Sequence, residues 1–146
     1  MNSKKNIKNI LDLSNLIILI LIIYLMKDLT LSDRRLSYLI MLCIILYFFG
    51  RITDSSQFIE IYHISFAIII FFSIFFFKNK NLILLHSIII ITAIATRKIF
   101  KKCIIRSLET KENFITNNII SKNLNWDYIF PILGLISNFR LYSQIY

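Results

Sequence analysis

Few side chains in this chain of 146 residues have the chemistry of a functional site. Glu60 and His63 form an E-x-x-H pair, a spacing that places both on one face of a helix. Di-iron helical bundles use this spacing, but they need two such pairs and two further glutamates. The other glutamates here, Glu109 and Glu112, lie far along the chain. We interpret Glu60 and His63 as a polar pair at the mouth of a helix, and we expect no metal and no cofactor.

The second histidine, His86, lies inside an apolar stretch, where an ionisable side chain is a candidate for a proton relay. We see no carboxylate inside the apolar stretches to partner it, so we favour a neutral imidazole that hydrogen-bonds to Ser65 or to a backbone carbonyl. Cys43 and Cys103 form no C-x-x-C motif, so redox chemistry has no support. The chain also lacks a phosphate loop, a zinc motif and a nucleophile elbow, and we do not expect an enzyme.

The elements that carry these residues are four apolar blocks without Asp, Glu, Lys or Arg. They cover residues 13–26, 36–49, 62–77 and 82–95. Each block is apolar all round, whereas a soluble helix of this length would keep a polar face. A block of 14 residues covers about 21 Å as a helix, and its flanking residues extend it toward the roughly 30 Å of a bilayer core. With 57% hydrophobic residues, two glycines and one proline, the composition excludes disorder, collagen and a disulfide scaffold.

The sequence therefore predicts an all-α polytopic membrane protein with four transmembrane helices in an up-and-down bundle. We place the spans at about residues 10–27, 36–51, 60–77 and 82–97. Short loops between the blocks favour antiparallel neighbours. Tyrosines near the block ends, such as Tyr24 and Tyr47, fit the interfacial belt of a bilayer. Residues 1–96 form the predicted bundle, and residues 97–146 form a separate membrane-associated tail.

Lysine and arginine near the spans predict the orientation. With four spans, the amino-terminal side of the bundle carries nine such residues: Lys4, Lys5, Lys8, Arg51, Arg97, Lys98, Lys101, Lys102 and Arg106. The opposite side carries five: Lys27, Arg34, Arg35, Lys78 and Lys80. Because cytoplasmic loops carry the excess of positive charge, we predict that both termini are cytoplasmic. The sequence does not indicate which membrane this is.

Residues 97–108 read as a basic amphipathic helix at the membrane surface. Its expected contacts with anionic headgroups are Arg97, Lys98, Lys101, Lys102 and Arg106. A cytosolic continuation of the fourth span is an alternative. The net charge of +9 is also typical of nucleic-acid binding. The basic residues lie close to the span ends, however, where membrane topology already accounts for them, so we predict lipid and not nucleic acid as the partner.

The sequence of the carboxyl-terminal segment is compatible with two topologies. Residues 109–125 are polar and predict a loop, with a short helix around residues 114–120. The apolar stretch that follows Trp126 is only about ten residues long, which favours an interfacial or re-entrant helix, capped by Asp127 with Pro131 in its first turn. A short fifth span is the alternative, and it would place the carboxyl terminus on the other side of the membrane.

Two functions remain open. The first is a structural or accessory membrane protein that packs against itself or against partner membrane proteins, through small residues in the fourth span. These helix-packing residues are Thr92, Ala93 and Thr96, together with Ala95. The second is a self-associating pore of the holin or viroporin kind. Its polar stripe would consist of His86, Ser65, Ser73, Ser87 and Thr92.

Overall fold

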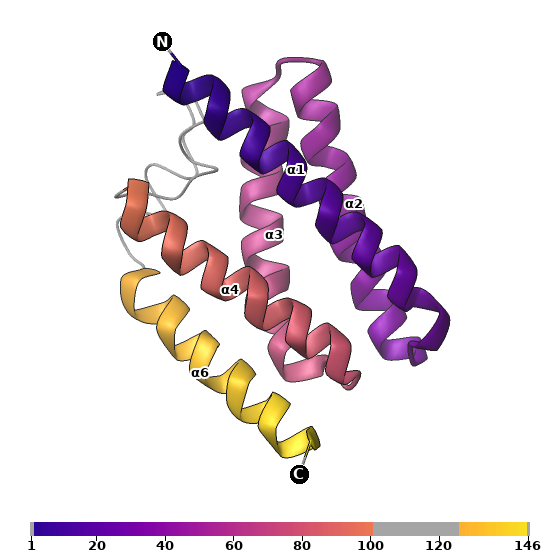
Figure 1. The fold of residues 1–146 in the computed structure, drawn as a ribbon. Helices are drawn as coiled ribbons and strands as arrows, with labels where there is room; N and C mark the ends of the chain where they lie inside the picture. The colour runs from indigo at the N-terminus through magenta and orange to yellow at the C-terminus, as the bar shows by residue number, and fades with distance from the viewer. Residues whose placement is uncertain (1, 101–125, 146) are drawn as a thin grey trace.

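The computed structural model describes residues 2–100 and 126–145, and these are almost entirely helical (Figure 1). The α-helices in these two ranges are α1 (Asn2–Leu25), α2 (Leu31–Ile52), α3 (Ser56–Phe76), α4 (Lys80–Phe100) and α6 (Trp126–Ile145). A single 3-10 turn, η1 (Met26–Asp28), follows α1. No strand occurs in the described ranges. The all-α prediction is confirmed.

Four of the described helices are long and apolar enough to cross a bilayer. The candidate spans are Lys8–Asp28, Leu31–Ile52, Ser56–Phe76 and Lys80–Ile99, each of 20 to 22 residues. The chain is therefore consistent with a multi-pass membrane protein. The helix that contains the second candidate span begins at Leu31, before residue 36, where the predicted span starts. The reason is that Thr30 caps α2 by accepting a hydrogen bond from the amide of Asp33, so the polar residues before the apolar block form the first turn.

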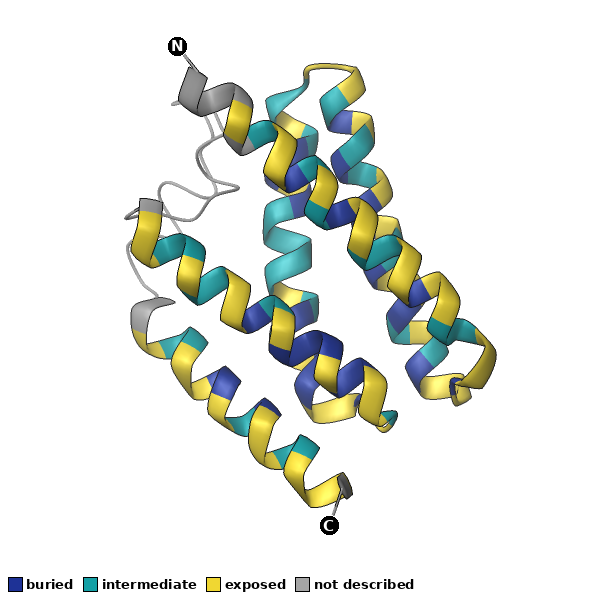
Figure 2. Cartoon of the chain, viewed as in Figure 1, coloured by how far each residue is buried: buried dark blue, intermediate teal, exposed yellow. Residues whose placement is uncertain are grey.

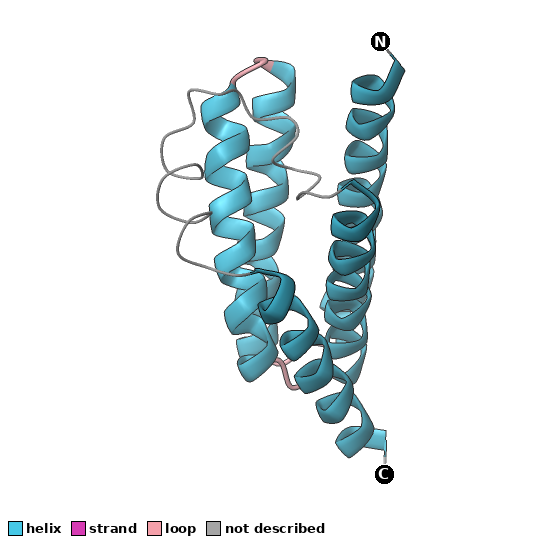
Figure 3. Cartoon of the chain, turned by 90° about the vertical axis from the view of Figure 1, so that its left-hand side faces the viewer, coloured by secondary structure: helices cyan, strands magenta, loops and turns pink. Residues whose placement is uncertain are grey.

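Successive described helices run in opposite directions (Figure 1). The closest packing is between α2 and α3 and between α4 and α6, while α1 contacts both α2 and α4. Seen from the side, the α2–α3 pair forms one layer, and α1 with α4 forms the other (Figure 3). One side of the molecule thus carries the start of α1 and the α2–α3 turn, and the opposite side carries the α1–α2 and α3–α4 turns (Figure 1).

The interior consists mainly of isoleucine side chains at the points where helices meet. Fully buried examples are Ile44 of α2, Ile74 of α3, and Ile83 and Ile90 of α4. The outward faces carry large hydrophobic side chains instead of charges. Exposed residues, coloured yellow in Figure 2, occur on every described helix. Among the candidate spans, the one in α1 is the least buried. Of its apolar segment, 17% is buried inside the protein, against 33–39% for the other three candidate spans. Such an outer surface suits lipid as its solvent.

The α2–α3 turn brings two helix backbones unusually close. A Cβ atom on Gly50 would lie 2.9 Å from Cβ of Phe58 and 3.2 Å from the amide nitrogen of Ile59. Because real Cβ atoms do not approach other atoms so closely, this position needs glycine. The turn itself places Asp54 at φ 49°, a left-handed conformation that aspartate tolerates better than most side chains.

The α3–α4 turn, on the opposite side of the molecule, is held by a buried carboxylate. Asp33, in the first turn of α2, has no solvent exposure and accepts hydrogen bonds from the amides of Lys78 at 2.9 Å and Asn79 at 3.0 Å. Thr30 also donates to Asp33. The side chain of Asn79 in turn caps α4 by accepting from the amide of Asn81. We call Asp33, Lys78 and Asn79 the Asp33 clasp, because this contact fixes the start of α2 against the start of α4.

The carboxyl-terminal segment differs from its predicted form. It is a continuous helix of 20 residues and not a helix of about ten, because the polar residues after Ile136 continue it to Ile145. Pro131 lies inside this helix, beyond the first turn in which we expected it. Arg97 and Lys98 belong to the last turn of α4. Most of the predicted amphipathic helix, together with the predicted loop and its short helix, lies outside the described residues.

We predict that Asp33→Asn destabilises the fold by about 1.5–3 kcal/mol, because the amides of Lys78 and Asn79 lose a charged acceptor in a buried place. The free energy of unfolding, measured by denaturant titration in mixed micelles, checks this expectation. Asp28→Asn is the matched control, since Asp28 is exposed on the same side of the molecule. Equal stabilities of the two variants would contradict the structural role of the clasp.

Candidate functional site

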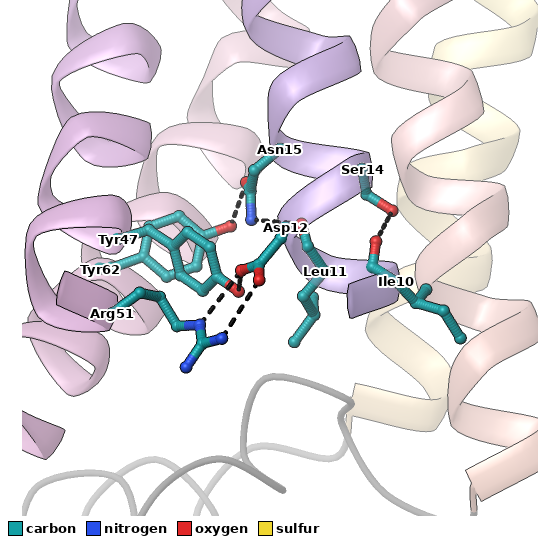
Figure 4. Close-up of polar contacts among 8 residues, drawn as sticks. All are labelled: Ile10, Leu11, Asp12, Ser14, Asn15, Tyr47, Arg51 and Tyr62. Atoms are coloured by element: carbon teal, nitrogen blue, oxygen red, sulfur yellow. Dashed lines mark hydrogen bonds and ion pairs between the residues drawn. The ribbon is translucent and has the colours of Figure 1, made fainter. Parts of the chain in front are cut away.

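Polar side chains from three helices meet near the middle of α1 (Figure 4). We call Asp12, Asn15, Tyr47, Arg51 and Tyr62 the Asp12 cluster. Arg51 donates from Nε and Nη2 to the two carboxylate oxygens of Asp12, both at 3.1 Å, and the hydroxyl of Tyr47 donates to Asp12 at 2.6 Å. This bidentate arrangement is the strong form of an arginine–carboxylate contact. It joins α1 to the end of α2.

The charges of the Asp12 cluster are matched within the molecule. The side chains of Arg51 and Asp12 are only 20% and 35% exposed, and Tyr47 has no exposure. A single positive charge faces a single negative charge, so the pair adds no net charge to the apolar region. Within hydrocarbon an unpaired charge costs several kcal/mol, and a bonded pair costs much less. The geometry therefore suits a contact that holds helices together.

A second contact of the same cluster joins α1 to α3. The hydroxyl of Tyr62 donates to the side-chain oxygen of Asn15 at 2.8 Å, and the side-chain nitrogen of Asn15 donates to the carbonyl of Leu11 at 3.1 Å. Both side chains are buried. The rings of Tyr47 and Tyr62 also lie against each other, with centroids 5.0 Å apart. One face of α1 is thus fixed to both helices of the α2–α3 pair.

A further cluster of buried polar side chains lies between α4 and α6. We call His86, Ser87 and Ser137 the His86 cluster. Nε2 of His86 lies 2.8 Å from the carbonyl of Ile70, and Nδ1 lies 3.2 Å from the hydroxyl of Ser137. The hydroxyls of Ser87 and Ser137 are 2.6 Å apart. Since a carbonyl only accepts, Nε2 carries a proton and donates to Ile70; in a neutral imidazole Nδ1 then accepts from Ser137, whose hydroxyl also lies 3.4 Å from the carbonyl of Ile83. The cluster joins α4 to both α3 and α6.

Sequence reasoning paired His86 with Ser65 or with a backbone carbonyl. The structure gives His86 a carbonyl, that of Ile70, and a serine, but the serine is Ser137 of α6. The difference has a simple origin, since we predicted α6 to be a short helix at the surface and did not place it against α4. Ser65 lies half-buried in α3.

The residues of the predicted polar stripe do not form one polar surface. Ser73 is buried and donates to the carbonyl of Ile70, and Ser87 is buried against Ser137. Thr92 is exposed on α4, but its hydroxyl donates to the carbonyl of Ile88 in its own helix. The predicted helix-packing residues Ala93 and Thr96 are half-buried, and Thr96 also donates within α4.

The remaining predicted positions contribute no reactive site. Cys43 is buried in α2, and Glu60 and His63 both lie in α3. Among the described residues, no group of three or more His, Cys, Asp or Glu side chains could hold a metal ion. Arg97 and Lys98 end α4 on the amino-terminal side of the molecule. The other predicted surface contacts, Lys101, Lys102 and Arg106, lie outside the described residues.

Sequence reasoning missed the residues that form most of these contacts. Asp12 and Asn15 are not among the candidate residues that the sequence motifs indicate. A stronger signal was available, because polar residues inside a membrane span are costly and face other helices. Asn15 should therefore have indicated a helix contact, although the sequence alone could not have named Tyr62 as its partner.

Comparison with known proteins identifies no relative. No protein-family model, no curated protein and no solved structure matches this chain. The function must therefore be inferred from the geometry of the chain itself, and the polar contacts between its helices are the most specific feature of that geometry.

For the Asp12 cluster we predict strong coupling between Asp12 and Arg51. The single variants Asp12→Ala and Arg51→Ala should each lose about 1–3 kcal/mol of unfolding free energy, because each leaves a charged side chain without its opposite charge. The double variant should lose less than the sum of the two. Unfolding in mixed micelles measures this cycle, with the exposed Asp28→Ala as control. Additive losses would show that the pair contributes nothing.

For the His86 cluster we predict that Ser137→Ala costs about 0.6–1.7 kcal/mol, the range for hydrogen bonds between membrane helices. The variant removes the partner of both His86 and Ser87. Ser143→Ala is a matched control in the same helix, since Ser143 is exposed and its hydroxyl donates to its own helix at Arg140. The same unfolding assay applies, and a loss no larger than that of the control would refute the contact.

Proposed function

We propose that this chain is an integral membrane protein of structural or accessory type, which packs against a second copy or against partner membrane proteins. The observation that carries the proposal is the separation of polar and apolar groups. The polar side chains of the Asp12 and His86 clusters bond within the molecule, and the outward faces carry large hydrophobic side chains. We propose no catalytic role.

The outward face of α1 supports this proposal. Its side chains include Leu13, 59% exposed, and Ile20, 56% exposed. On the opposite face the Asp12 cluster fixes α1 to α2 and α3. A helix that is held by specific polar contacts on one face and is apolar on the other presents a defined surface to lipid or to another membrane helix.

The small residues of α4 provide a second outward surface. Thr92 and Ala95 are both exposed, and the hydroxyl of Thr92 is already bonded within its helix. Small side chains allow two membrane helices to approach closely, which is where dispersion forces and weak hydrogen bonds act. We propose this part of α4 as the place where a second copy or a partner helix packs.

We further propose that the side carrying the start of α1 and the α2–α3 turn faces the cytoplasm. Among the described residues with placed side chains it carries Lys8, Arg51, Arg97 and Lys98, and the opposite side carries five (Lys27, Arg34, Arg35, Lys78 and Lys80), so the proposed orientation rests on the count over the whole sequence. The excess of lysine and arginine over the whole sequence, counted near the spans, favours the same side. The basic residues that end α4 are then at the level of the anionic headgroups of the cytoplasmic leaflet.

The arrangement of the polar stripe argues against the pore. A pore wall needs polar groups that face a common axis and remain available to water. In this fold His86, Ser73 and Ser87 are buried against α3 and α6, so self-association cannot line a channel with them unless α6 leaves α4.

The decisive experiment reconstitutes the purified chain in lipid vesicles and then in a planar bilayer. We expect the protein to float with the vesicles after an alkaline wash and to give no single-channel current at any applied voltage. Flotation shows that the protein has inserted into the membrane. The absence of current then shows that the inserted protein forms no pore. Reproducible current steps would favour the pore, and protein that stays in the soluble fraction would refute the membrane proposal altogether.

A further inference from the structure

Helix α6 lies along α4 over most of the length of that helix, and the two run in opposite directions (Figures 1 and 3). The two helices are in contact at several positions along their lengths. A Cβ on Gly134 would lie 3.4 Å from Ile90, at the middle of α4, and 4.0 Å from Ile94 beyond it. Further along α6, Ser137 reaches His86 and Ser87 in the first half of α4. The pairing is therefore not confined to one end of α4.

The end of α6 reaches the α3–α4 turn. The guanidinium of Arg140 donates to the carbonyl of Phe77 at 2.7 Å, and the side-chain amide of Gln144 donates to the carbonyl of Lys78 at 3.0 Å. Phe77 and Lys78 lie just before α4 begins at Lys80. From Gly134 to Gln144 the helix thus descends alongside α4 until it reaches the turn on the side opposite to the start of α1.

The dimensions of α6 fit a complete crossing. A helix of 20 residues is about 30 Å long, close to the thickness of the hydrocarbon core. A re-entrant or interfacial helix would remain near one surface, whereas α6 runs alongside α4 from the α3–α4 turn, where Gln144 bonds to Lys78, to beyond the middle of α4, where Gly134 packs against Ile90 and Ile94.

The polar residues of α6 explain why its sequence reads as less apolar than the four other spans. Ser137 is fully buried against α4, and the side chain of Asn138 donates to the carbonyl of Gly134 in its own helix. Arg140 lies near the end of α6, where its guanidinium contacts the backbone that ends α3. Ser137 and Asn138 are bonded within the protein and do not need water along the length of the helix, and Arg140 is placed at the level of the α3–α4 turn.

We propose that α6 is a fifth membrane crossing, and that the end of α6 lies on the side of the α3–α4 turn, opposite to the start of α1. This inference rests on the proposed membrane location of α1 to α4. It replaces the sequence-based expectation that both termini are cytoplasmic. The beginning of the chain stays on the cytoplasmic side, and the end of α6 is on the other side.

Single cysteines test this topology. In a background with Cys43→Ala and Cys103→Ala, we would introduce Ser143→Cys near the end of α6, Thr53→Cys in the α2–α3 turn and Asn81→Cys at the start of α4. All three positions are exposed. A membrane-impermeant maleimide is added to sealed right-side-out vesicles and to inverted vesicles. We expect the cysteines at 143 and 81 to react in one preparation, and the cysteine at 53 to react in the other.

The two controls separate the possible failures. If the cysteines at 53 and 81 react from the same side, then α3 does not cross, and the membrane proposal fails together with this one. If these two react from opposite sides and the cysteine at 143 shares the side of 53, only the fifth crossing is refuted. A cysteine at 143 that reacts from neither side until detergent is added also refutes it, because the end of α6 would then lie inside the membrane.

A cross-link provides a second measurement that does not depend on accessibility. Because the hydroxyls of Ser87 and Ser137 are 2.6 Å apart, the pair Ser87→Cys and Ser137→Cys should form a disulfide when the membrane-bound protein is oxidised with copper phenanthroline. The pair Ser87→Cys and Ser143→Cys is the control, since residue 143 lies six residues further along α6. We expect the first pair to cross-link at least tenfold more than the control. Equal cross-linking would overturn the proposal.

Discussion

In hydrocarbon no water is available to a polar group, so each buried donor or acceptor must find its partner inside the protein. The helices of this chain satisfy their backbones internally, and the polar side chains that join one helix to another follow the same constraint. Asp12 meets Arg51, Asn15 meets Tyr62, and His86 meets Ser137. Apolar packing alone has little preference for one helix arrangement, because lipid tails are as apolar as isoleucine. The polar contacts therefore determine which helices lie together.

These contacts join segments that are far apart in sequence. The Asp12 cluster fixes α1 to the α2–α3 pair, and the His86 cluster fixes α4 to α3 and α6. The Asp33 clasp connects the two turns on the opposite side of the molecule. Between these points the interface is filled by isoleucine, leucine and phenylalanine. The contacts thus lie near both ends of the bundle as well as within it.

The sequence was sufficient to predict the helices but not their neighbours. The four uncharged blocks of the sequence correspond to the four candidate spans, because the affinity of a segment for lipid depends mainly on its composition. The partners of Asn15 and Asp33 lie 47 and 45 residues away, and no periodicity in one sequence encodes such distances. The length of α6 was underestimated for a related reason. Ser137 and Arg140 read as the end of an apolar stretch, and only the tertiary structure shows that α4 and the α3–α4 turn receive them.

The Asp33 clasp has a consequence for biosynthesis. Asp33 leaves the ribosome 45 residues before Lys78, so α1 and α2 are complete before the amides that bind this carboxylate exist. During that interval the carboxylate needs another partner, and water at the membrane surface supplies it, because Asp33 lies in the first turn of α2 and not at the centre of that helix. Packing of the α3–α4 turn against the start of α2 then buries Asp33, and this can happen only after Lys78 and Asn79 have been synthesised.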